Sequence, residues 1–287
     1  MRKERVAVIT GASAGMGLVA AKALAAQGWR VIALGRDTQR CAAGEAEIRA
    51  AAPGADVSMI RADLALMSEA VRAAKEIAAQ TDRIDVLINN AGGAAKEKAV
   101  TAEGNEETFA SNHLGHFILT HRLLPLLQAA AANSPAGSTR ILNMSSSAHE
   151  VSPGLDFDDL QMMANFIPIK AYCNAKLANI YFTRVLAQRL AGSGIVVHAM
   201  HPGAVNTNFV DRADAGTQAY LRTITLLSPE EGADTLVWLV TAPEAGENSG
   251  RYWCQRKAVS ASAVANDLAA AERLWRESEK LAAGFLD

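Results

Sequence analysis

Short apolar runs, rich in β-branched residues, alternate along the chain with longer segments in which apolar residues recur every three or four positions. The short runs are typical of buried parallel strands, and the longer segments are typical of amphipathic helices. Strands are predicted at residues 5–10, 30–34, 56–60, 84–89, 140–144, 195–200 and 250–254, and helices near 15–27, 37–52, 67–80, 105–131, 170–191, 229–241 and 263–283. This alternation predicts one α/β domain over residues 1–287, built on a Rossmann-type, doubly wound, seven-stranded parallel sheet.

Two connections between predicted elements are much longer than the others. They lie near residues 147–169 and 203–228, and each follows a predicted strand. Ligands of open α/β sheets bind outside the carboxyl ends of the strands. Long connections at that edge are therefore expected to form the walls and the lid of a substrate site.

Composition and charge exclude several classes of partner. The 287 residues carry a formal net charge of -2, so neither nucleic acid nor an anionic membrane is expected as a partner. No apolar run reaches the ~18 to 20 residues of a membrane span, and neither a membrane anchor nor a secretory segment is expected. Cys41, Cys173 and Cys254 stand singly without metal-ligand spacing, which favours a reducing cytoplasm and no metal site.

The first predicted strand runs into a glycine-rich turn, Thr10-Gly11-Ala12-Ser13-Ala14-Gly15-Met16-Gly17. Glycines at such a turn let the backbone approach a pyrophosphate, and the N-terminus of the following helix offers unpaired N–H groups. A purely structural turn is the alternative, but the position between a strand and a helix favours nucleotide binding. The candidate cofactor-binding residues of this turn are Gly11, Ser13, Ala14, Gly15, Met16 and Gly17.

The end of the second predicted strand indicates which dinucleotide binds. An acidic residue here accepts hydrogen bonds from the adenosine ribose 2′-hydroxyl, whereas a cation accommodates a 2′-phosphate. Arg36 occupies this end of the strand, which favours NADP(H) over NAD(H). The alternative is a solvated arginine that is paired with Asp37.

The third and fourth predicted strands end in further candidate nucleotide ligands. Asp63, followed by Leu64, is placed to meet the adenine amino group or, alternatively, to cap the next helix. Asn90, Ala91 and Gly92 follow the fourth strand, where asparagine can tie neighbouring backbone together and Gly92 permits close approach of the nucleotide.

The segment from Ile169 to Asn179 contains Tyr172 and Lys176, four residues apart on one face of a predicted helix that Pro168 introduces. A phenol with a pKa near ~10 is a poor acid or base at neutral pH. A nearby ammonium favours the phenolate and is expected to lower the pKa of Tyr172 toward the working range. The pair could therefore act as an acid/base catalyst, whereas an exposed lysine beside a half-buried tyrosine is the alternative.

With these segments in order, the chain resembles the short-chain dehydrogenase/reductase family over residues 5 to about 210. The resemblance rests on Thr10-Gly11-x-x-x-Gly15-x-Gly17, Asp63, Asn89-Asn90-Ala91-Gly92, Asn112, the serines at 145–147, Tyr172-x-x-x-Lys176 and Pro202-Gly203. The segments 112–117, 143–149, 172–179 and 273–278 resemble the retinol-dehydrogenase-like branch. Members of that branch often carry an N-terminal membrane anchor, which is not expected here. NADP-preferring members often carry a basic residue at the position of Ala14, so Arg36 bears the cofactor preference alone.

The resemblance implies a role for each catalytic candidate. Tyr172 would be the proton donor for carbonyl reduction or the base for alcohol oxidation. Lys176 would assist Tyr172 and hydrogen-bond the nicotinamide ribose, so both residues also count as cofactor-binding. Ser146 would hold the substrate oxygen, with Ser147 as the alternative. Asn112 would help to hold a water that relays protons to Lys176.

A later segment completes the cofactor site that the resemblance implies. Pro202, Gly203, Val205 and Thr207 are expected to bind the carboxamide end of nicotinamide.

The sequence therefore predicts an NADP(H)-dependent oxidoreductase that interconverts an alcohol and an aldehyde or ketone on a mostly apolar small molecule. The alternatives are a nucleotide-sensing regulator on the same fold and an epimerase or dehydratase. The resemblance also implies a homodimer or homotetramer, assembled through the helices near 105–131 and 170–191, and the single cysteines favour a cytoplasmic location. The sequence decides neither the substrate nor the direction of the reaction.

Overall fold

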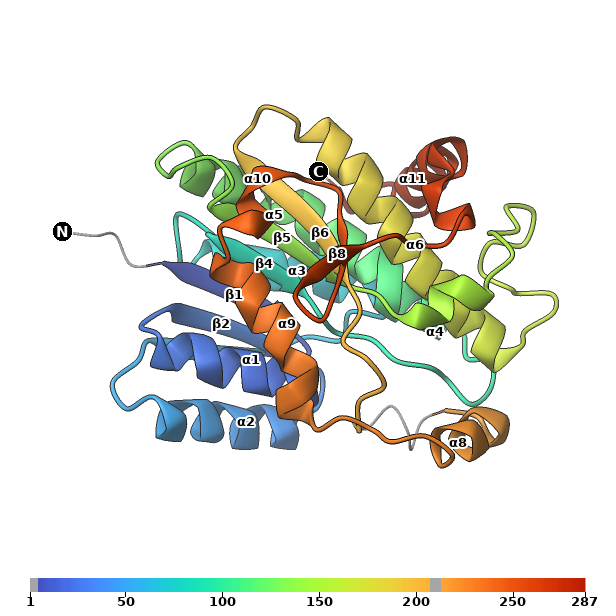
Figure 1. Ribbon diagram of the computed structural model, residues 1–287, viewed down its shortest axis with the longest axis horizontal. Helices are drawn as coiled ribbons and strands as arrows, with labels where there is room; N and C mark the ends of the chain where they lie inside the picture. Colours follow the sequence, from blue (N-terminus) through green and yellow to red (C-terminus); the bar gives the residue numbers. More distant parts are fainter. Residues whose placement is uncertain (1–4, 207–212, 287) are drawn as a thin grey trace.

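One sheet organises the computed structural model, which describes residues 5–206 and 213–286 (Figure 1). Its strand order is β3-β2-β1-β4-β5-β6-β7-β8. The strands are β1 (Val6–Thr10), β2 (Arg30–Gly35), β3 (Val57–Arg61), β4 (Val86–Asn89), β5 (Thr139–Met144), β6 (Ile195–Met200), β7 (Tyr252–Cys254) and β8 (Lys257–Val259). Strands β1 to β7 pair in parallel, which confirms the doubly wound Rossmann-type fold.

The eighth strand differs from the prediction of a seven-stranded parallel sheet. Strand β8 pairs with β7 in the antiparallel direction after a two-residue turn at Gln255 and Arg256. Both turn residues have positive φ angles, 49° and 58°, which suit the tight turn of a two-residue hairpin. The run of residues 250–254 alone gives no sign of this return strand.

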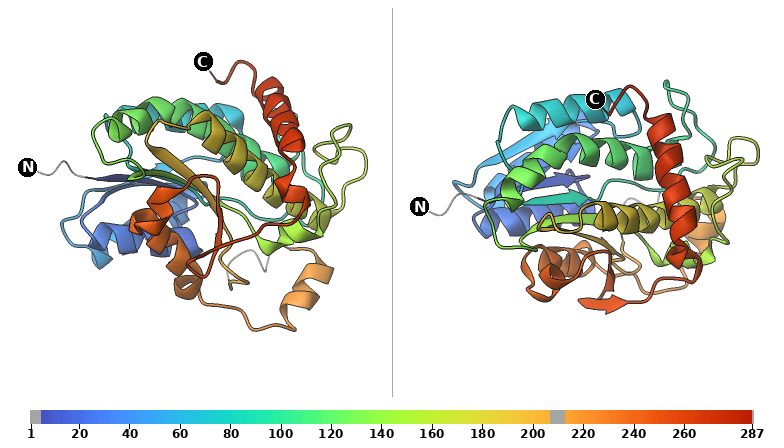
Figure 2. Two further views of the ribbon diagram at one scale, coloured as in Figure 1. Left: turned by 45° about the horizontal axis from the view of Figure 1, so that its top comes forward. Right: turned by 90° about the horizontal axis from the view of Figure 1, so that it is seen from above.

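Helices cover both faces of the sheet (Figure 2). The helices α1 (Gly15–Ala26), α2 (Thr38–Ala51) and α9 (Pro229–Thr241) pack on one face, and α3 (Met67–Ala78), α5 (Gly115–Ala131) and α6 (Pro168–Arg189) pack on the other. Two apolar clusters fill the spaces between these layers, and the central strands are buried on both sides. The helix predicted near 263–283 is confirmed as α11 (Leu268–Leu281), whereas the short helices α8 (Ala215–Leu221) and α10 (Glu244–Glu247) were not predicted.

The single helix predicted near 105–131 is interrupted. A short α4 (Glu107–Phe109) leads into a π-helical turn over Ala110–Leu114, and α5 follows. The interruption lies at Asn112, whose side-chain Nδ2 donates to the carbonyl of Thr108 at 2.7 Å and to that of Gly93 at 2.8 Å. A π-turn of this kind re-aims one side chain of a helix, and sequence periodicity does not reveal it.

Helix α11 packs on the outer side of α6 and reaches α5, as the red helix in Figure 2 shows. Its Trp275 lies 5.0 Å from the ring of Phe117 and 5.9 Å from that of Phe182, measured between centroids. The buried His113 contacts Ser278 of α11 through its Nε2, at 2.7 Å. The C-terminal helix is therefore part of the main apolar core.

In the described ranges 5–206 and 213–286, every helix is too short or too polar to span a bilayer.

Candidate active site

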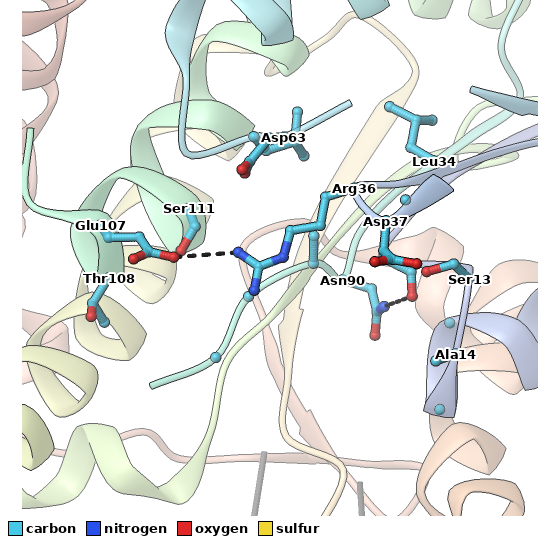
Figure 3. Close-up of a pocket in the computed structure, with 18 of the residues that line it drawn as sticks. Ser13, Ala14, Leu34, Arg36, Asp37, Asp63, Asn90, Glu107, Thr108 and Ser111 are labelled. Carbon is cyan, nitrogen blue, oxygen red and sulfur yellow. Dashed lines mark hydrogen bonds and ion pairs between the residues drawn. The ribbon is translucent and has the colours of Figure 1, made fainter. Parts of the chain in front are cut away.

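A groove of about 560 Å³ lies at the carboxyl ends of the strands, where the chain order reverses between β1 and β4 (Figure 3). A topological switch point of this kind is where open α/β sheets bind nucleotides. Twelve predicted cofactor residues line the groove, namely Gly11, Ser13, Ala14, Gly15, Met16, Gly17, Arg36, Asp63, Leu64, Asn90, Ala91 and Gly92.

The glycine turn is closed against the end of β4. Asn90 donates from Nδ2 to the carbonyl of Thr10 at 2.9 Å and to that of Gly11 at 3.3 Å. A Cβ atom at Gly17 would lie 2.3 Å from the carbonyl oxygen of Gly11, so no larger residue fits there. Helix α1 begins after Ala14 without a side-chain cap, which leaves its first N–H groups for an anion. These residues fit the pyrophosphate of a dinucleotide.

A buried histidine connects this turn to Asn112. His116 Nδ1 lies 3.1 Å from the carbonyl of Asn112 and must donate to it, so Nε2 accepts from the Thr10 hydroxyl at 2.9 Å. The Thr10 oxygen in turn accepts from the backbone N–H groups of Asn90 and Ala91, both at 2.9 Å. Burial lowers the pKa of His116 to about 4, so the ring is neutral and this arrangement of donors holds at neutral pH.

Arg36, at the end of β2, does not pair with Asp37, which was the alternative prediction for this arginine. Arg36 Nη1 contacts Glu107 Oε1 across the groove at 3.3 Å, whereas Asp37 caps α2 by accepting from the N–H of Arg40 at 2.8 Å. Figure 3 shows the arginine crossing the groove toward Glu107. The alternative was wrong because helix capping engages Asp37.

Asp63 lines the groove and does not cap α3. Its Oδ1 accepts from the N–H of Ala65 at 3.1 Å, while the helix starts only at Met67. The carboxylate of Glu103 takes the N–H groups of Met67 and Ser68 instead. Of the two predicted positions, Asp63 therefore occupies the one at the groove and not the one at the helix cap.

Tyr172, Ser146 and Lys176 come together beyond the carboxyl end of β5. Lys176 Nζ lies 5.3 Å from the centroid of the Tyr172 ring, as the four-residue spacing predicts. Burial raises the pKa of Tyr172 above its ordinary value, while a hydrogen bond with the Ser146 side chain lowers it. Burial is the larger effect, so the lowering of the Tyr172 pKa that the sequence predicts from Lys176 is not found, and Tyr172 is protonated at neutral pH.

Lys176 is buried between β5 and the groove. Its Nζ lies 3.5 Å from the carbonyl oxygen of Met144, and a Cβ atom placed on Gly92 would lie 3.5 Å from the same nitrogen. Gly92 lines the groove, so the amine of Lys176 lies close to the groove wall. Burial lowers the pKa of Lys176 to about 8, so most of the amine is charged at neutral pH.

Asn112 is fully buried and also lies next to Gly92. A Cβ atom at Gly92 would lie 2.3 Å from Asn112 Oδ1, which also accepts from the N–H of Gly93 at 3.2 Å. Asn112 and Lys176 therefore flank the same glycine, as expected of residues that share one site.

The three serines that follow β5 have different environments. Ser145 is buried and donates to the carbonyl of Lys176 at 2.8 Å, Ser146 meets Tyr172, and Ser147 is exposed. This arrangement favours Ser146 over Ser147 as the residue that would hold a substrate oxygen.

His149 is buried and engages backbone through both ring nitrogens. Nδ1 donates to the carbonyl of Ser146 at 2.7 Å, and Nε2 accepts from the N–H of Ser262 at 3.1 Å. The ring thus ties the Ser146 turn to the segment after β8.

The expected nicotinamide segment is only partly described. Thr207 lies outside the described residues, and Pro202, Gly203 and Val205 do not line the groove itself. A Cβ atom at Gly232 would lie 2.5 Å from Val205 and 2.9 Å from the sulfur of Met16, so the segment adjoins the glycine turn.

Four charged residues that line the groove were missed by sequence reasoning: Arg40, Lys96, Glu97 and Glu107. Arg40 lines the groove from the first turn of α2, four residues after Arg36, and this closeness in sequence could have identified it. Glu107 is 71 residues away from Arg36 along the chain, and no local pattern connects the two.

Comparison with known proteins agrees with this geometry. Residues 5–218 match the short chain dehydrogenase family. Human retinol dehydrogenase 13 is 36% identical over 285 residues, which cover 96% of this chain and 84% of that protein. A crystal structure of an uncharacterized protein from Mycobacterium paratuberculosis has a TM-score of 0.75 and 32% identity, covering 96% of this chain and 92% of that one. The Pseudomonas aeruginosa RhlG/NADP active-site complex has a TM-score of 0.68 and 28% identity, covering 86% of this chain and 93% of that one. The chain therefore belongs to the short-chain dehydrogenase family of oxidoreductases, and its similarity to retinol dehydrogenases places it in their branch of that family.

Proposed function

We propose that this chain is an NADP(H)-dependent oxidoreductase that interconverts an alcohol and an aldehyde or ketone on a mostly apolar small molecule. The observation that carries the proposal is the convergence of Ser146, Tyr172 and Lys176 beside a groove that fits a dinucleotide. The similarity to retinol dehydrogenase 13 and to a structure solved with NADP supports the same reading.

The glycine turn would hold the pyrophosphate, Asp63 the adenine, and Arg36 with Arg40 a 2′-phosphate. Lys176 would hold the nicotinamide ribose. A bound nicotinamide ring supplies or accepts the hydride. The protein's own task is then to place the substrate carbon next to that ring and to handle one proton.

Tyr172 would supply that proton in the reducing direction. Because burial keeps its hydroxyl protonated, Tyr172 can donate to the oxygen of a carbonyl as negative charge develops there. Ser146 would donate a hydrogen bond to the same oxygen, and Asn112 would help to return a proton through water and Lys176.

An apolar substrate is supported by the connections near 147–169 and 203–228. Val151, Ile167 and Tyr220 carry exposed apolar side chains in these segments, with exposed fractions of 72%, 41% and 63%. The role of both connections as substrate loops, the cytoplasmic location and the assembly into homodimers or homotetramers stay predictions. Helix α11 covers part of α5 and α6, so assembly through those helices would have to use the faces that α11 leaves open.

A nucleotide-sensing regulator on the same fold is the second candidate. The resemblance implies that such proteins lack the tyrosine or the lysine, and this chain has both. An epimerase or dehydratase of the extended branch would have a different glycine spacing and a larger C-terminal substrate domain.

The proposal is tested by Tyr172→Phe in an assay that follows NADPH absorbance with a panel of apolar aldehydes and ketones. The variant should lose about 10²- to 10⁴-fold in turnover, because the proton donor is removed, while it still binds NADPH. Tyr181→Phe is the matched control, since Tyr181 lies on the same helix and donates to the carbonyl of Val264 at 2.9 Å. Substantial turnover by a Tyr172→Phe protein that binds cofactor would rule out the assigned role.

A further inference from the structure

An ion pair crosses the nucleotide groove at the place where the proposed function puts the adenosine ribose. Arg36 leaves the carboxyl end of β2, Glu107 begins α4 on the opposite wall, and their side chains meet at 3.3 Å. Both residues line the groove together with Asp63, Thr108 and Ser111 (Figure 3). A ligand that uses Arg36 therefore meets Glu107 as well.

The pair is easily separated. Each side chain is 38% exposed, and ion pairs of this exposure contribute little to stability because water screens them. A phosphate carries more charge than a carboxylate and offers more acceptor oxygens to the guanidinium. A 2′-phosphate is therefore able to replace Glu107 at Arg36.

Glu107 differs from Asp37 and Asp63, the acids that follow β2 and β3 at this groove. Asp37 accepts from the N–H of Arg40, and Asp63 accepts from the N–H of Ala65, so both carboxylates are engaged by nearby backbone. Within residues 5–206 and 213–286, Arg36 is the only group that bonds to the Glu107 carboxylate. When a phosphate takes Arg36, Glu107 keeps its negative charge close to the phosphate without that partner.

We propose that Glu107 is a specificity-determining residue whose carboxylate competes with the 2′-phosphate of NADP(H) for Arg36. NAD(H) has no 2′-phosphate, so it leaves the ion pair intact and is not penalised. Glu107 thus reduces the preference for NADP(H) below what Arg36 and Arg40 alone would give. This inference rests on the proposed binding of NADP(H).

The test compares dissociation constants of NADPH and NADH for the wild type, Glu107→Gln and Glu107→Ala, measured by calorimetric titration. Both variants should bind NADPH about 3- to 10-fold more tightly, because a repulsive charge close to the phosphate is removed, and NADH within about 2-fold of wild type. The gain for NADPH should shrink at high salt, since screening weakens the repulsion between carboxylate and phosphate.

Glu47→Gln is the matched control. Glu47 pairs with Lys22 at the same distance of 3.3 Å, is also exposed, and does not line the groove, so its loss changes net charge equally. It should leave the ratio of the two dissociation constants unchanged.

Two results would overturn the inference alone. If the wild type prefers NADPH but Glu107→Gln leaves the ratio unchanged, Glu107 does not compete with the phosphate. If Glu107→Gln tightens NADPH and NADH equally, the carboxylate obstructs the groove without sensing the phosphate. A wild type that binds neither dinucleotide overturns the proposed function, and the inference fails with it.

Discussion

Lys176 holds a positive charge in a buried position, and this makes its protonation sensitive to pH. Burial disfavours the ammonium and lowers the pKa of Lys176 from 10.5 to about 8. The charge is therefore present below about pH 8 and is lost above it.

We expect kcat/KM for NADPH-dependent carbonyl reduction to fall as the pH rises through about 8, because the amine that we propose to hold the cofactor ribose loses its charge. Lys176→Arg should remove this falling limb, since a guanidinium stays protonated over the whole range, although the overall rate will be lower. The pH dependence of initial rates checks this expectation. A falling limb that persists unchanged in Lys176→Arg would assign it to another group.

Helix α5 is positioned by one glycine at its first residue. A Cβ atom at Gly115 would lie 2.1 Å from the carbonyl oxygen of Leu64, so this helix passes directly against the loop that follows β3. Leu64 lines the nucleotide groove, and Asn112 lies one turn before Gly115. The same close contact therefore places the Leu64 wall of the groove and the end of the π-helical turn.

Gly115→Ala should destabilise the protein by about 1 to 3 kcal/mol, because the helix or the loop must move to admit the methyl group. Urea unfolding measures this change as a lower midpoint. Gly93→Ala is the control, because no atom lies within 4 Å of a Cβ at Gly93 and its backbone has no positive φ. Equal midpoints for Gly115→Ala and the wild type would contradict this prediction, because they would mean that the loop after β3 moves without loss of stability.

At the level of the complete chain, the last helix completes the core on one side of the sheet. Trp275 is 6% exposed, packs against Phe117 of α5 and Phe182 of α6, and lies under Arg189 with the guanidinium carbon 4.4 Å from the ring centroid. Three segments distant in sequence thus share one aromatic cluster, which includes the buried His113. The C-terminal segment is needed to cover α5 and α6.

Trp275→Ala should lower the free energy of unfolding by about 3 to 5 kcal/mol, the usual cost of removing a buried aromatic ring. Leu268→Ala is the control on the same helix, because Leu268 is 44% exposed and should change stability by less than about 0.5 kcal/mol. Urea unfolding curves of both variants check these expectations, provided that their m-values equal that of the wild type. A Trp275→Ala protein as stable as the wild type would mean that α11 is not part of the cooperative core.

Local pattern alone was enough for the parallel sheet, the glycine turn and the one-turn spacing of Tyr172 and Lys176. Each of these depends on periodicity or on neighbouring residues, so the physical cause is contained in a short stretch of chain. The seven parallel strands and the positions of the main helices were predicted for the same reason.

Three contacts were decided only by the tertiary structure. They are the ion pair of Arg36 with Glu107, the hydrogen bonds of His149 to Ser146 and Ser262, and the packing of α11 on α6. These contacts join residues up to 113 positions apart, and they form only because the crossover connections bring the strand ends to one edge of the sheet. The π-turn at Asn112 and the burial that raises the pKa of Tyr172 likewise depend on what packs around them. Sequence periodicity does not predict these contacts, because each partner depends on how distant segments pack and not on the residues next to it in the sequence.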